Sequence, residues 1–252
     1  MPSPGHLPEH GEGERSRVFP SLCDWLDDEV ELRWLLDFLL LIWRTENLDW
    51  LLLTKRPELF WQRMSQIVNF LPLADPKTAG FTSWLLNWLE DCPPKNVWIG
   101  TSVENQAMAD KRIEWLMKIP ATIRFLSVEP LLEKVDLFYS EFTNIDWVIV
   151  GGESGAKARP CNIQWVRDIV FQCKSAEVPC FVKQLGSHPV CTLSRSQMKG
   201  TIPDDLRAFS DPKCGDSAEW PEDLAVREYP KIMDTSPRPS PRKRGEGERG
   251  AP

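Results

Sequence analysis

The sequence lacks a long hydrophobic run and a recognisable export signal. Its longest apolar stretch, Trp34 to Trp43, is interrupted by Asp37. That stretch is about half of the roughly 20 residues that a membrane-spanning helix needs. The first residues, MPSPGHLPEHGEGER, contain no basic region followed by an apolar one, so no secretory signal is expected. These absences predict a cytoplasmic protein that does not enter a membrane.

The cysteines lack the spacing of a metal site. There are seven, an odd number, and none forms a Cys-x-x-Cys pair. This pattern favours free thiols over a disulfide framework. Cys173 and Cys180 are close in sequence, but we expect one late in a helix and the other at the start of a strand. Buried structural cysteines are the favoured interpretation, and a zinc or iron–sulfur site is the alternative.

The charge is distributed unevenly along the chain. The net charge is −7, residues 235–252 carry five Arg or Lys against two Glu, and residues 1–16 carry one Arg against three Glu. A net charge of −8 therefore remains on residues 17–234. An acidic body disfavours attraction of a nucleic-acid backbone, so nucleic acid is not an expected partner.

Both ends of the chain have a composition typical of disorder. The strings PSP and GEGER occur near the start and again near the end. Segments this rich in Pro, Gly, Glu and Arg bury too little apolar surface to fold. We therefore predict a disordered tail over 1–16, a folded domain over 17–232 and a disordered basic tail over 233–252. The shared strings also lead to the hypothesis that a repeated element has cut or rearranged the start of the folded unit.

Six short apolar runs alternate with helical patterns in the folded domain. This alternation is typical of an α/β fold whose parallel sheet is covered on both faces. Six strands are too few for an eight-stranded barrel, so we predict a partial (β/α) barrel with about six parallel strands. Helices are predicted over Glu29 to Thr45, from Pro57, over Ser83 to Cys92, after Ser102 and over Ile163 to Ala176, and an extended cap over Glu219 to Pro230. The predicted strands are Arg17 to Leu22, Trp50 to Thr54, Val97 to Thr101, Ile123 to Val128, Trp147 to Val150 and Cys180 to Lys183.

Charged and small polar residues follow these strands. In βα units the carboxyl ends of the strands share one rim, where such folds build their sites. Converging acids and amines shift each other's pKa, as acid–base catalysis requires. Each residue alone also has a structural explanation, such as a helix start, a turn or an ion pair. The predicted catalytic residues are Lys55, Glu129, Glu153 and Lys183, and the predicted ligand-binding residues are Arg56, Ser102 and Glu104.

A glycine-rich turn follows the fifth predicted strand. Gly151 and Gly152 permit close approach of the backbone, and exposed amides there could receive an anion. A tight turn without a ligand is the alternative. The segment lacks the spacing of a Rossmann or a Walker motif, which argues against nucleotide binding by those routes.

These segments together resemble a known family. LDWLLLTKRPE, NVWIGTSVENQ, IRFLSVEPLL, IDWVIVGGESG, VPCFVKQLG and PEDLAVREYP are similar to segments of the phage-associated three-cysteine-motif proteins, a radical-SAM-like family of unknown function. The resemblance covers about residues 17–232. It implies a [4Fe–4S] cluster and S-adenosylmethionine in full-length relatives. The cysteine motif that would hold the cluster is missing here, so no cofactor is expected in this chain.

The leading hypothesis is an N-terminally truncated radical-SAM-like protein that keeps the substrate side of the barrel. One alternative is a cluster-independent enzyme that acts on a small anionic molecule. Another is a module that binds a protein partner. Whether the chain is an enzyme stays open at this point.

Overall fold

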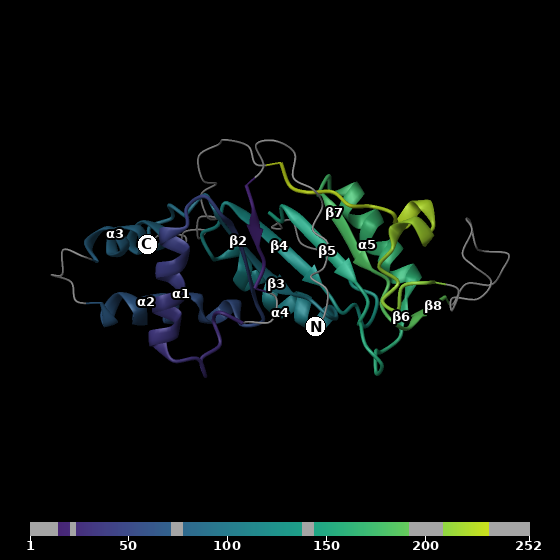
Figure 1. Ribbon diagram of the computed structural model, residues 1–252, viewed down its shortest axis with the longest axis horizontal. Helices are drawn as coiled ribbons and strands as arrows, with labels where there is room; N and C mark the ends of the chain where they lie inside the picture. The colour runs from purple at the N-terminus through teal and green to yellow at the C-terminus, as the bar shows by residue number, and fades with distance from the viewer. Residues whose placement is uncertain (1–14, 21–23, 72–77, 138–143, 192–208, 232–252) are drawn as a thin grey trace, which may run out of the picture.

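Six parallel strands form one curled sheet in chain order. The structure is a computed structural model that describes residues 15–20, 24–71, 78–137, 144–191 and 209–231. The sheet runs from β1 at one edge to β7 at the other and forms a half barrel (Figure 1). The predicted partial barrel is therefore confirmed, while most of both predicted tails lies outside the described residues. The strands are β1 (Arg17–Val18), β2 (Asp49–Thr54), β3 (Val97–Ser102), β4 (Ile123–Val128), β5 (Trp147–Gly151) and β7 (Cys180–Gln184).

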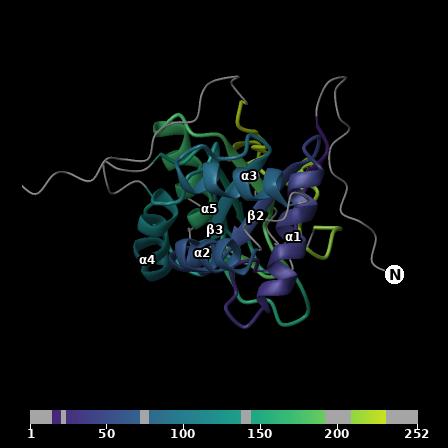
Figure 2. The same cartoon turned by 90° about the vertical axis from the view of Figure 1, so that its left-hand side faces the viewer.

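The helices connect successive strands of this sheet. In Figure 1, α1, α2 and α3 gather at one end of the molecule and α5 lies towards the other. Figure 2 faces the first end and shows these three helices in front of the sheet. Two further strands, β6 (Cys161–Asn162) and β8 (Pro189–Val190), pair with each other. The helices are α1 (Leu32–Arg44), α2 (Phe60–Phe70), α3 (Ala79–Leu89), α4 (Gln106–Met117) and α5 (Ile163–Ser175).

The convex face of the sheet packs against the helices. Alternate strand residues such as Leu52, Ile99 and Val148 are buried in one cluster with helix residues such as Leu39 and Ile169. Side chains alternate between the two faces of a strand, so the residues between them point to the concave face. The helices therefore do not cover the concave face.

The concave face is filled mainly by aromatic side chains from the strands themselves. A separate buried cluster contains Trp98, Phe125 and Trp147, with Phe181 and Tyr229 packed against it. Helices cover only the convex face, because strands in sequential order place their right-handed crossovers on one side. The predicted covering of the sheet on both faces is present, with helices on one face and aromatic side chains on the other. The rings on β3, β4, β5 and β7 come from the first three residues of each strand, away from the carboxyl ends.

The ends of the described domain meet at the open side of the half barrel. The guanidinium carbon of Arg17 lies 4.9 Å from the centroid of the Tyr229 ring and 5.4 Å from that of Trp98. The segment around Tyr229 also lies along β7, where the Glu228 N–H donates to the Cys180 carbonyl at 2.8 Å. The predicted extended cap therefore covers the β7 edge, and Arg17 links this cap to β1.

Helix α1 differs from its prediction in start and in burial. The predicted helix begins at Glu29, but α1 begins at Leu32. The Asp27 side chain accepts a hydrogen bond from the Glu29 N–H at 2.9 Å, and this local turn competes with helix. The helix was also expected to be buried on most sides. Instead, Trp34 is 67% exposed and Leu41 is 48% exposed, so one apolar face is open.

Candidate functional site

Three carboxylate–cation pairs lie at the carboxyl ends of the sheet strands. Carboxylates follow β3, β4 and β5, and lysines follow β2 or end β7. Parallel strands bring these positions to one rim, as the sequence predicts. The carboxylate side chains are only 13–30% exposed, whereas the lysines and Arg159 of the pairs are 44–60% exposed. The rim therefore presents cationic groups to solvent above partly buried carboxylates.

Glu104 forms the most enclosed of these pairs. Its Oε2 accepts a hydrogen bond from Arg112 Nη1 at 2.7 Å, and its Oε1 lies 3.6 Å from the Lys55 ammonium. Arg112 Nη1 also donates to the Ser102 carbonyl at 2.9 Å. The α4 N-terminus is capped by Asn105 instead, which accepts from the Met108 N–H at 2.9 Å. Capping the helix therefore does not explain Glu104.

Glu129 receives hydrogen bonds from two consecutive residues of β7. Lys183 Nζ donates to its Oε2 at 3.0 Å, and Gln184 Nε2 donates to its Oε1 at 3.2 Å. The same Gln184 amide donates to the Gly152 carbonyl at 2.9 Å. Gln184 is buried, so it fixes Glu129 against the sheet while Lys183 reaches towards solvent.

Glu153 forms a bidentate pair with Arg159. Arg159 Nε and Nη2 donate to the two carboxylate oxygens at 2.8 and 3.0 Å, and the Arg159 N–H donates at 2.9 Å. These hydrogen bonds lower the pKa of Glu153 to about 2. The Glu153 carboxylate, and more weakly Glu104, raise the pKa of Arg159. Arg159 thus connects the Glu153 pair electrostatically to Glu104.

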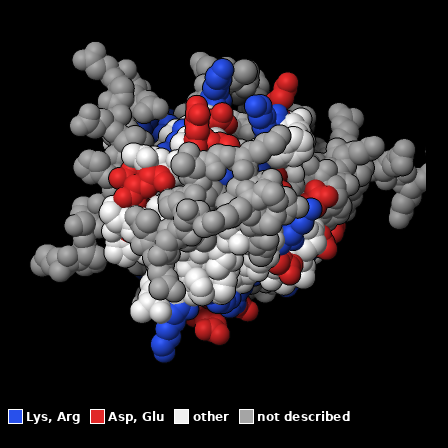
Figure 3. Space-filling view, turned by 90° about the vertical axis from the view of Figure 1, so that its right-hand side faces the viewer, with Lys and Arg blue, Asp and Glu red and all other residues white. Residues whose placement is uncertain are grey.

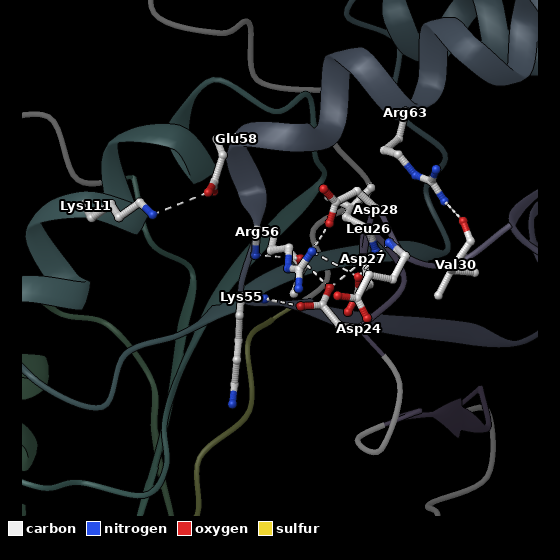
Figure 4. Close-up of polar contacts among 12 residues, drawn as sticks. Asp24, Leu26, Asp27, Asp28, Val30, Lys55, Arg56, Glu58, Arg63 and Lys111 are labelled. Carbon is white, nitrogen blue, oxygen red and sulfur yellow. Dashed lines mark hydrogen bonds and ion pairs between the residues drawn. The ribbon is translucent and has the colours of Figure 1, made fainter. Parts of the chain in front are cut away.

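Arg56 is held away from this group of pairs. Its guanidinium contacts the carboxylate of Asp27 at 2.9 Å and that of Asp28. Figure 4 shows the Lys55 side chain pointing away from this contact. The structure therefore places Arg56 in an ion pair with the loop after β1, apart from the other predicted ligand-binding residues.

The glycine-rich turn brings β5 and β7 into close contact. The Gly152 N–H donates to the Gln184 carbonyl at 3.0 Å, and the Gly151 carbonyl accepts from the Leu131 N–H at 2.9 Å. A Cβ atom on Gly152 would lie 2.3 Å from the Leu185 carbonyl oxygen. These contacts favour the tight-turn alternative, because the Gly152 amide predicted to receive an anion is used within the fold.

The remaining predicted residue, Ser102, is buried at the end of β3. Sequence reasoning missed Arg112, Arg159 and Gln184, which hold the three carboxylates. Only the last was adjacent to a predicted residue. Arg112 lies two helical turns after Glu104, and Arg159 lies six residues after Glu153. A search of the sequence for a nearby cationic partner of each carboxylate could have found both arginines.

The comparison with protein families decides where this chain belongs. A family model described as a protein of unknown function (DUF5131) matches residues 6–207. The chain belongs to this family. No curated protein and no solved structure matches it significantly. The DUF5131 match covers every rim residue described above.

The cysteines of this DUF5131 protein do not fit a cluster in the part that the structure describes. Within those ranges, no three His, Cys, Asp or Glu side chains stand together so that they could hold a metal ion. Cys161, Cys173, Cys180 and Cys214 are buried, as predicted for structural thiols, while Cys191 is partly exposed and Cys92 is exposed. The seventh cysteine lies outside the described residues. No described helix is both long and apolar enough to span a bilayer.

Proposed function

We propose that this chain is the substrate side of a radical-SAM-like half barrel and that its rim binds a small anionic molecule. The resemblance to the phage-associated family and the six parallel strands in chain order support the first part. The second part rests on the arrangement of charge at the rim. A ligand that approaches the rim meets Lys55, Arg159 and Lys183 before the carboxylates, because these cations are the more exposed members of their pairs.

The rim cations and carboxylates favour an anion for a second reason. Four cations, including the enclosed Arg112, face three carboxylates, so the rim carries a net charge of +1. The Arg159 guanidinium offers paired donors that match a carboxylate or phosphate. A bound anion would share these cations with the rim carboxylates, which stay close enough to accept hydrogen bonds from polar groups of the ligand.

Lys183 is the residue we propose for proton transfer, with Glu129 as the carboxylate that orients it. The pKa of Glu153 near 2 keeps that carboxylate ionised at neutral pH, so it serves as a fixed anion that orients Arg159. Lys183 donates a hydrogen bond to Glu129 and is half exposed, so a ligand can reach its ammonium group. In this proposal Lys183 binds and protonates the ligand while Glu129 holds the ammonium in place.

A matched pair of lysine variants tests the rim. Inorganic phosphate, citrate and adenosine monophosphate are first screened as probes by calorimetry. We expect Lys183→Met to weaken binding of the best probe about tenfold, the size of a lost charged contact. The control is Lys118→Met, which removes a 2.7 Å ion pair with Glu114 on α4. Equal effects of the two substitutions, or no binding of any anion, would contradict the proposal.

The expected lack of a cluster has a separate test. A [4Fe–4S] site of the kind implied for full-length relatives needs three thiolates close together. We expect anaerobic reconstitution of the purified chain to give no stoichiometric cluster by absorption and electron paramagnetic resonance spectra. A near-stoichiometric cluster would overturn this expectation, and Cys173 and Cys180 would be the first residues to substitute.

A further inference from the structure

A groove of about 1450 Å³ lies at the end of the sheet opposite the rim. It runs between the outer side of α5 and the segment that covers β7, and it includes the starts of β4 and β7 at Ile123 and Cys180. The rim residues do not line it. This second surface is therefore separate from the site proposed above and does not depend on that proposal.

The groove is acidic. Its lining contains five carboxylates and three cations, a net charge of −2. Arg167 is paired with Asp223 at 2.5 Å, and Asp168 lies 3.8 Å from the Lys134 ammonium, so two of the carboxylates already have a cationic partner. Glu177 and Glu228 are both exposed. The carboxylates belong to Asp146, Asp168, Glu177, Asp223 and Glu228.

The end of α5 adds to this negative potential. The helix ends at Ser175, and the next residues, Ala176 and Glu177, line the groove. The C-terminal end of a helix carries the negative end of its dipole, which favours a cation nearby. Lys174 in the last turn offsets only part of the negative potential at this end of the helix. Two independent features, side-chain charge and helix direction, thus favour a cationic occupant.

The groove also exposes an aromatic ring. Phe171 is 71% exposed, the highest value among the large apolar side chains of the described residues. Val170 and Val178 beside it are partly buried against the main core. Figure 3 faces the end of the molecule that carries α5 and shows both carboxylate and cationic side chains around uncharged surface. Exposed aromatic groups next to complementary charge are typical anchors of protein interfaces.

We propose that this groove binds a basic segment of a partner protein that carries one bulky apolar side chain. The apolar side chain packs on Phe171, and Lys or Arg side chains of the segment contact Glu177 and Glu228. Nucleic acid and anionic membrane surfaces are repelled by the same carboxylates. A peptide segment is the occupant that satisfies both the acidic lining and the exposed ring.

Selection from a random dodecapeptide library on the full chain tests the proposal. We expect enriched peptides to contain at least two Lys or Arg and one Trp, Phe or Leu. Phe171→Ser and Glu177→Lys should each weaken a selected peptide about tenfold, the scale of an interface anchor. The controls are Trp34→Ser, which removes a similarly exposed ring on α1, and Glu114→Lys, which reverses an exposed charge on α4.

Three outcomes would overturn the proposal. The first is enrichment of acidic peptides or of none. The second is binding that Trp34→Ser weakens as much as Phe171→Ser does. The third is a zero-length carboxyl–amine cross-link between Glu228 and Lys243 in the full chain, which would assign the groove to the chain's own C-terminal residues. Weakening by added salt is expected for the basic peptides and supports the charge contacts.

Discussion

The Asp24 carboxylate accepts hydrogen bonds from the Thr54 hydroxyl at 2.6 Å and from the Lys55 N–H at 2.9 Å. These two contacts tie the loop after β1 to the end of β2, and Figure 4 shows the one between Asp24 and Lys55. They also fix the backbone from which Lys55 extends to Glu104. Asp24 is therefore a positioning residue for the rim, although the sequence gives no pattern that singles it out.

Removal of this carboxylate should weaken both the fold and the rim. Asp24→Ala leaves the buried Thr54 hydroxyl without its acceptor, a loss of about 1–3 kcal/mol. The expected result is a lower urea midpoint together with weaker binding of the anion that the rim prefers. Asp37→Ala, which removes an exposed carboxylate on α1, is the matched control and should change neither quantity. A normal midpoint for Asp24→Ala would refute the structural role.

The Glu153–Arg159 pair predicts a stability change at acidic pH. The hydrogen bonds from Arg159 lower the Glu153 pKa from 4.5 to about 2. A depressed folded-state pKa means that the stabilisation is fully present above pH 4.5 and is lost as the pH falls through 2. The difference in urea midpoint between the natural protein and Glu153→Gln should therefore shrink over this range. A difference in urea midpoint that stays constant over this range would contradict the pairing. Glu114→Gln, at an exposed carboxylate, is the control.

The thiols should differ strongly in reactivity. Burial raises the pKa of Cys161 to about 12 and that of Cys214 to about 11. The pKa of Cys173 is also raised, by its contact with Cys180 and by burial. Because the thiolate is the reactive form, a disulfide reagent at neutral pH should modify exposed Cys92 long before these three. Cys92→Ser should remove the contribution of Cys92 to that early phase, and rapid modification of Cys161 in the folded protein would contradict the burial.

Gly100 should tolerate no side chain. A Cβ atom there would lie 2.4 Å from the Phe125 ring, which is fully buried on the concave face. Overpacking of this kind costs about 1–3 kcal/mol, so Gly100→Ala should lower the urea midpoint. Phe125→Leu in the same chain should recover part of the loss. Gly80→Ala in α3 is the control. A Cβ atom there would lie 3.2 Å from the nearest atom of the Trp43 ring, so the effect should be smaller.

The open face of α1 should drive association. Trp34 and Leu41 are exposed on this helix, and exposed apolar side chains promote self-association. We expect the isolated chain to form dimers or larger species in light scattering. Replacement of both residues by Glu should reduce the apparent mass, whereas deletion of residues 1–16 and 235–252 should not. A monodisperse monomer of the natural chain at tens of micromolar would contradict this prediction.

The sequence was informative where local pattern determines structure. The apolar runs ending at Thr54, Val128 and Lys183 predicted three sheet strands and the rim positions after them. The aromatic filling of the concave face was not predicted, because an apolar run does not reveal whether a helix or an aromatic ring covers a given face. Arg112 and Arg159 were missed for a related reason, since the partner of a carboxylate depends on how a helix or loop returns to the sheet.

Because Arg17 lies against the Tyr229 ring, we expect the first strand and the last described segment to open together. Neither is long enough to be stable alone: β1 has two residues, and the segment at β7 forms a single bridge, between Phe181 and Arg227. Unfolding of one of these two segments should therefore free the other from the sheet. In hydrogen exchange the amides of β1 and of residues 226–228 would open together, although more than two hundred residues separate them in the chain.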